Sequence, residues 1–162
     1  MHNEVLNHLR DFCSQLHRTT QASPKGYHDV DEHGSQVGNK QPDLLITLPT
    51  KSVLVDVRGV DPCSPSASLR NSKDAHKASA AAAAEKIKKY QPIASRKGVL
   101  FQPFVFTIFG ALHSSASDLI DMLLANSGLP NKSSIRYTKL AEMTMAIMRD
   151  NTRMVQDAHR RA

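Results

Sequence analysis

Two aspartates, Asp43 and Asp56, are the residues whose type and spacing point most directly to chemistry. Each belongs to a run of alternating aliphatic and polar residues, and Pro49-Thr50 separates the two runs. If that pair centres a tight turn, Asp43 lies opposite Asp56, with Cβ atoms about 5 Å apart. Two ionised acids this close repel one another, and a divalent cation between them removes the cost. Because hard oxygen ligands suit magnesium or manganese, the pair predicts a metal site.

A purely structural interpretation of the same two acids stays open. Asp43 could be a strand-entry residue after Pro42, and Asp56 could form an ion pair with Arg58. The register is itself an inference, because a slip of one residue would turn Asp56 to the other face of the sheet.

A basic turn further along the chain supplies a second set of candidate residues. Lys86, Lys89 and Tyr90 fall three and four residues apart, so they share one face of a helix. The turn could be an ordinary solvated surface, or it could aim a lysine at a scissile phosphate. Two metal-binding acids and an ammonium group would support phosphodiester hydrolysis. No Gly-rich phosphate loop occurs, so nucleotide hydrolysis of the P-loop type is not indicated.

The elements that must position these residues follow from periodicity. Period-two alternation predicts a hairpin over residues 42–58. An alanine-rich segment then predicts a long helix over 73–97, with Ser72 as its cap. A strand over 99–109 follows, and its Pro103 indicates a bulge or an edge position. Strand, helix and strand together form a crossover unit.

Three more helices complete the predicted α/β fold. An amphipathic helix is expected over residues 3–20, a shorter helix over 115–127 and a final one over 134–160. The order is helix, β-hairpin, long helix, strand and helix, which we take as a core over 1–130, followed by a basic C-terminal helix within 131–162. The arginines of the last helix are either a solvated terminus or a contact to phosphates.

A polar connector over residues 19–39 precedes the hairpin. Its segment 28–33 holds three acids and two histidines without a regular ligand spacing, so a solvated loop is favoured. Asp31 or Glu32 could still lend the hairpin site a third carboxylate.

Composition narrows the partners of this 162-residue chain, a length typical of one domain. Basic residues exceed acidic ones, 21 − 15 = +6, which favours an anionic partner such as nucleic acid.

Cys13 and Cys63 make no metal or disulfide pattern, and the N-terminus has no signal-peptide pattern, so we expect an intracellular location, the nucleus included. No apolar run approaches about 20 residues, so no membrane span is expected. The oligomeric state is left open.

Taken together, the motifs resemble a nuclease family. Pro42-Asp43, a spacer and Asp56-Val-Arg58 are similar to the PD-(D/E)XK motif of restriction-like nucleases. The wider set resembles the restriction-like endonuclease domain of site-specific non-LTR retrotransposons, over roughly residues 35–115; it comprises Lys40-Gln-Pro-Asp43-Leu-Leu-Ile, Val55-Asp-Val57, Lys86-Ile-Lys-Lys-Tyr90, Gly98, Phe101-Gln-Pro-Phe104 and Phe109-Gly110.

The resemblance implies a restriction-endonuclease-like core that nicks DNA with magnesium or manganese. It implies Asp43 and Asp56 as metal ligands and Lys86 or Lys89 as the catalytic lysine, while Lys40, Arg58 and Tyr90 are the expected substrate contacts. In such elements the domain follows a reverse transcriptase, so this chain would be a fragment.

One position departs from the general motif, which has a lysine two residues after the second acid. That position is Arg58, whose guanidinium stays charged and cannot exchange a proton, although it could hold a phosphate. An inactive nucleic-acid-binding module, or a non-functional remnant of an element, is therefore the alternative function.

Overall fold

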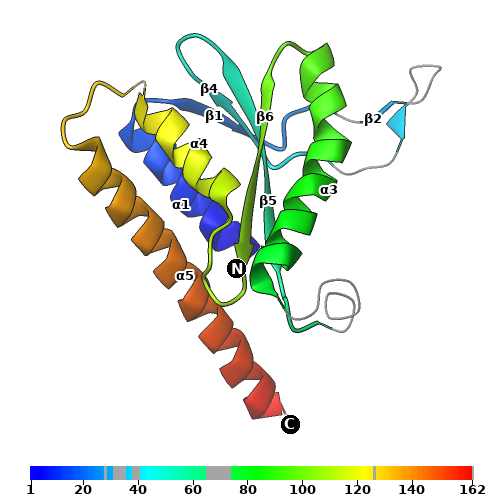
Figure 1. The fold of residues 1–162 in the computed structure, drawn as a ribbon, viewed down its shortest axis with the longest axis vertical. Coiled ribbons are helices and arrows are strands. Elements are labelled where there is room, and N and C mark those ends of the chain that lie inside the picture. The colour runs from blue at the N-terminus through cyan, green and yellow to red at the C-terminus, as the bar shows by residue number, and fades with distance from the viewer. Residues whose placement is uncertain (28, 31–35, 38–40, 65–73, 126, 162) are drawn as a thin grey trace.

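The protein has an α/β fold built on a four-stranded mixed sheet with helices on both faces (Figure 1). The computed structural model describes residues 1–27, 29–30, 36–37, 41–64, 74–125 and 127–161. The sheet order is β1-β4-β5-β6, and β2 and β3 form a separate two-stranded sheet. The elements are α1 (His2–Gln15), β1 (Thr19–Ala22), β2 (Asp29–Val30), β3 (Gln36–Val37), β4 (Leu44–Thr47), β5 (Ser52–Val60), α3 (Ala75–Arg96), β6 (Leu100–Thr107), α4 (Ser114–Ala125) and α5 (Lys132–Arg161).

The hairpin at the centre of the sheet has the predicted register from Leu44 to Thr47, but the predicted pairing of Asp43 with Asp56 is not part of the ladder. β4 and β5 are antiparallel and pair Leu44 with Val55. The Leu48 N–H donates to the carbonyl of Lys51 at 2.9 Å, which closes the expected turn. One step beyond Leu44 the pairing becomes irregular, because the N–H of Asp43 donates to the carbonyl of Val55 at 3.0 Å.

The predicted crossover unit is also present, since β5 and β6 are parallel and α3 joins them. β6 is the last strand of the sheet, so Pro103 lies on an edge strand, where its missing N–H is tolerated. Asp74 caps α3, because its carboxylate accepts from the backbone N–H groups of His76 at 2.9 Å and Lys77 at 3.2 Å. The prediction of Ser72 as the cap is therefore wrong.

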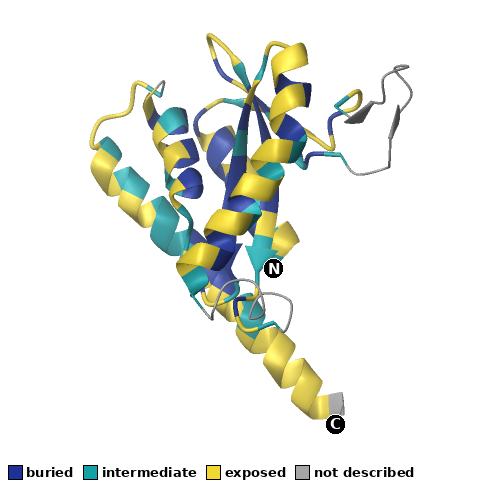
Figure 2. Ribbon diagram, turned by 45° about the vertical axis from the view of Figure 1, so that its right-hand side comes forward, coloured by how far each residue is buried: buried dark blue, intermediate teal, exposed yellow. Residues whose placement is uncertain are grey.

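Two apolar cores lie on opposite faces of the sheet (Figure 2). Val53, Val55 and Val57 of β5 belong to the larger core, which α1, α4 and the first half of α5 cover. Leu54 belongs to the smaller core against α3, together with Tyr90, Ile93, Ala94 and Phe101. Alternation along β5 therefore directs Asp56 towards α3.

The N-terminal region differs from the prediction of a helix over residues 3–20. α1 ends at Gln15, and His17 has a left-handed backbone with φ of 54°. Residues Thr19–Ala22 then form β1, which pairs antiparallel with β4. This strand is mostly exposed, so backbone pairing stabilises it rather than an alternating apolar face.

The last helix, α5, has two dissimilar halves. Met143, Ala146 and Ile147 are buried, whereas residues 152–160 are exposed, and the helix extends past the body of the molecule (Figure 1). Among the described helices, none combines the length and the apolar character needed to cross a membrane.

Candidate functional site

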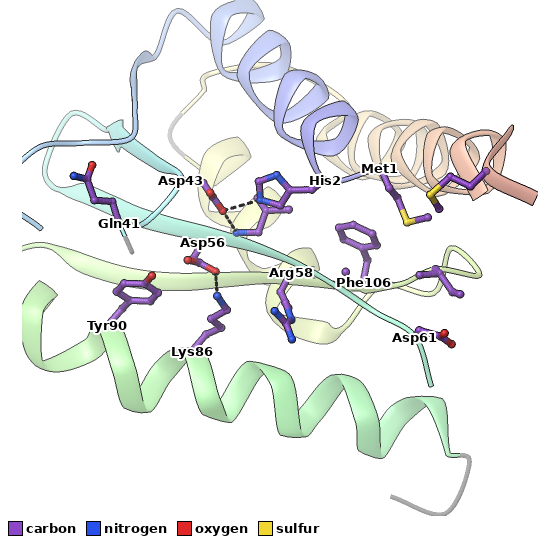
Figure 3. A pocket seen from close by; sticks show the side chains of 14 residues that line it. Met1, His2, Gln41, Asp43, Asp56, Arg58, Asp61, Lys86, Tyr90 and Phe106 are labelled. Atoms are coloured by element: carbon purple, nitrogen blue, oxygen red, sulfur yellow. Dashed lines mark hydrogen bonds and ion pairs between the residues drawn. The ribbon is translucent and has the colours of Figure 1, made fainter. Parts of the chain in front are cut away.

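A cavity of about 560 Å³ opens between α1, the central hairpin and α3 (Figure 3). Five of the residues predicted to form a site line it: Asp43, Asp56, Arg58, Lys86 and Tyr90. They come from the start of β4, from β5 and from α3, so the fold gathers them from segments distant in sequence. Asp61 and Gln41, which were not predicted, also line the cavity.

Asp56 and Lys86 form the least exposed ion pair of the site. Lys86 Nζ lies 2.7 Å from Asp56 Oδ2. The Lys86 side chain is 16% exposed and the Asp56 side chain is 4% exposed. Burial raises the pKa of Asp56 above its ordinary value, although the nearby Lys86 ammonium acts in the opposite direction. The ion pair that the structural interpretation assigned to Asp56 is therefore made with Lys86, on α3.

One oxygen of this pair lacks a well-aligned donor. Asp56 Oδ2 is buried and accepts no hydrogen bond from any residue in the described part of the chain. Its close partner is the Lys86 ammonium at 2.7 Å, so this oxygen is held by an ion pair. A hard cation at this oxygen would take the place of the ammonium.

Asp43 is held by two donors on one oxygen. Its Oδ2 accepts from the backbone N–H of Val57 at 2.7 Å, and His2 Nε2 lies 3.0 Å from the same atom. The hydrogen bond to Asp43 raises the pKa of His2, while partial burial opposes the shift. Sequence reasoning missed His2, because only the packing of α1 against the sheet brings it to a carboxylate 41 positions away.

The two candidate lysines of α3 occupy different places around Tyr90. Lys86 reaches Asp56, whereas Lys89 Nζ lies 4.7 Å from the centroid of the Tyr90 ring and is not among the residues that line the cavity. Tyr90 is 1% exposed and packs against Phe101, with ring centroids 5.3 Å apart. Burial and the Asp56 carboxylate raise the pKa of the Tyr90 phenol, which keeps it protonated.

Some predicted contributors lie outside the described residues. They are Lys40, Asp31 and Glu32. Within the described part of the chain, no group of three or more histidine, cysteine or acidic residues is placed to hold a metal ion. Asp61 lines the cavity without forming such a group with the other two acids, so the candidate donors are Asp43 and Asp56. Two carboxylates fit magnesium, which often binds through one or two carboxylates and retains several waters.

No protein-family model and no curated protein matches this chain. What the site does is therefore argued from its own geometry.

Proposed function

We propose that this protein is a metal-dependent DNA endonuclease that nicks a target site by phosphodiester hydrolysis. The observation that carries the proposal is the meeting of Asp43, Asp56 and Lys86 in one cavity. The order of helix, hairpin, long helix, strand and helix further supports a restriction-endonuclease-like core, of the kind carried by site-specific non-LTR retrotransposons. The net charge of +6 favours an anionic polymer as the substrate.

The chemistry divides among the residues that line the cavity. Asp43 and Asp56 would hold magnesium or manganese, which when bound lowers the pKa of a coordinated water and offsets charge on the phosphate. With Asp56 compensated in this way, the Lys86 ammonium can donate to a phosphate oxygen. Arg58 is exposed and can hold a second phosphate through its planar guanidinium.

A plasmid-nicking assay tests the proposal. We expect the protein to convert supercoiled plasmid to the nicked form in magnesium and to stop when EDTA is added. Asp43→Asn and Asp56→Asn should each lower the rate at least ~100-fold, because a bound metal supplies several kcal/mol of stabilisation to the transition state. Glu85→Gln, an exposed acid on α3, is the matched control and should nick like the wild type. Nicking that persists in both aspartate variants, with circular dichroism unchanged, would contradict the assignment.

A second candidate function is DNA binding without cleavage. The observation in its favour is the ion pair itself, because Lys86 already compensates Asp56 and Arg58 occupies the position of the motif lysine. DNA binding that weakens steeply with salt, without a magnesium-dependent product, would select this candidate.

A further inference from the structure

We propose that His2 is a positioning residue that fixes Asp43 as a metal ligand. The inference rests on the proposed function and adds to it a residue from α1. Its basis is the pair of donors on Asp43 Oδ2, Val57 N–H at 2.7 Å and His2 Nε2 at 3.0 Å. A carboxylate oxygen has about two acceptor sites, so these donors saturate Oδ2 and leave Oδ1 for a cation.

The two donors reach Asp43 from different elements, which is why they fix its orientation. Val57 lies on β5, the neighbouring strand, and His2 lies at the start of α1 (Figure 3). The Asp43 side chain is 22% exposed, so burial alone would not hold its rotamer. Without His2, one backbone N–H would remain, and the carboxylate could turn about it.

His2 is itself held in place. Its Nδ1 lies 3.2 Å from Asn3 Oδ1, and one and two turns further along α1 the buried Val5 and Leu9 anchor the helix in the larger core. Each carboxylate of the site thus has a basic partner from a different helix, His2 from α1 for Asp43 and Lys86 from α3 for Asp56. Removing a residue that orients a metal ligand in this way usually lowers the metal affinity about 10–100-fold.

Metal-induced thermal stabilisation measures this role apart from catalysis. The melting temperature of the full chain, with any purification tag placed at its C-terminus, is followed against MnCl₂ and MgCl₂ concentration. We expect His2→Ala to raise the metal concentration at half-maximal shift about 10-fold or more. His2→Gln keeps an amide N–H donor and should stay within about threefold of the wild type. His8→Ala, on the same helix, is the matched control and should titrate like the wild type.

The possible outcomes separate the inference from the proposed function. A wild type that shifts with metal and nicks plasmid, beside a His2→Ala variant with the same half-saturating concentration, overturns the role of His2 alone. A folded His2→Gln variant whose half-saturating metal concentration rises about 10-fold or more overturns it as well, and that result holds even if His2→Ala fails to fold. A wild type without any metal-induced shift overturns both the metal site and the inference.

Discussion

At the scale of single residues, the site is a pair of carboxylates whose charges are compensated in different ways. Asp43 is partly exposed, and its carboxylate accepts a hydrogen bond from a backbone N–H and contacts the His2 ring. Asp56 is nearly buried and depends on Lys86. Truncating one partner of a buried pair leaves the other charge uncompensated, and that is more costly than losing the attraction itself.

Lys86→Met should therefore destabilise the metal-free protein at pH 7 by about 1–3 kcal/mol. The loss of stability should shrink on acidification, because Asp56 becomes protonated and no longer carries an uncompensated charge. Burial raises the pKa of Asp56 above 3.8, the value we assign to the unfolded chain, so the folded state binds the proton more readily. The penalty of an uncompensated carboxylate is present above the folded pKa and disappears as pH falls towards 3.8.

Urea unfolding in EDTA between pH 4 and pH 8 measures this difference. Lys88→Met, an exposed lysine two positions along α3, is the control and should change the free energy of unfolding by under about 0.5 kcal/mol. A Lys86→Met difference that stays constant with pH, or that grows on acidification, would rule out the electrostatic origin.

At the scale of elements, local pattern determined the hairpin. Alternation in β4 and β5, with a proline turn between them, sufficed to predict the pairing of Leu44 with Val55. β1 carries no such pattern, because Thr19–Ala22 is polar and mostly exposed, and it exists through its backbone pairing with β4. His2 likewise has no local signal, since its contact depends on how a helix packs. Sequence predicted the elements that bury an apolar face and missed those that lack one.

The long helix α3 continues through Pro92, so a substitution at this position tests what the proline does to the stability of the helix. A proline has no N–H to donate to the carbonyl four residues earlier, and its ring crowds that carbonyl. Pro92 is exposed, so no packing contact offsets the cost. Pro92→Ala should raise the free energy of unfolding by about 1–2 kcal/mol. The gain from an alanine inside the helix should exceed the stability lost because alanine gives the unfolded chain more conformational freedom than proline does. Urea unfolding measures the change, with Glu85→Ala as the exposed control. A destabilised Pro92→Ala protein would show that the proline ring stabilises the folded helix.

At the scale of the whole molecule, two cores of unequal size enclose the sheet, and the site borders both, through Val57 and Phe106 of the larger core and Tyr90 of the smaller one. α1 and α3 lie on opposite faces, yet His2 and Lys86 both reach the cavity. The geometry of the site therefore depends on both helices holding their places against the sheet. α5 belongs to that framework as well, because Met143 and Ile147 lie in the larger core and the Asp150 carboxylate lies 2.6 Å from the amino group of Met1.

The unequal halves of α5 lead to a prediction about global stability. Removing residues 155–162 should change the free energy of unfolding by under about 0.5 kcal/mol, because the described side chains in this segment are exposed. Ile147→Ala, in the buried half of the same helix, should cost about 2–5 kcal/mol through lost burial and the cavity left behind. Urea unfolding of both variants makes the comparison. A truncated protein that loses as much stability as Ile147→Ala would mean that the projecting end of α5 packs against the body of the molecule in solution.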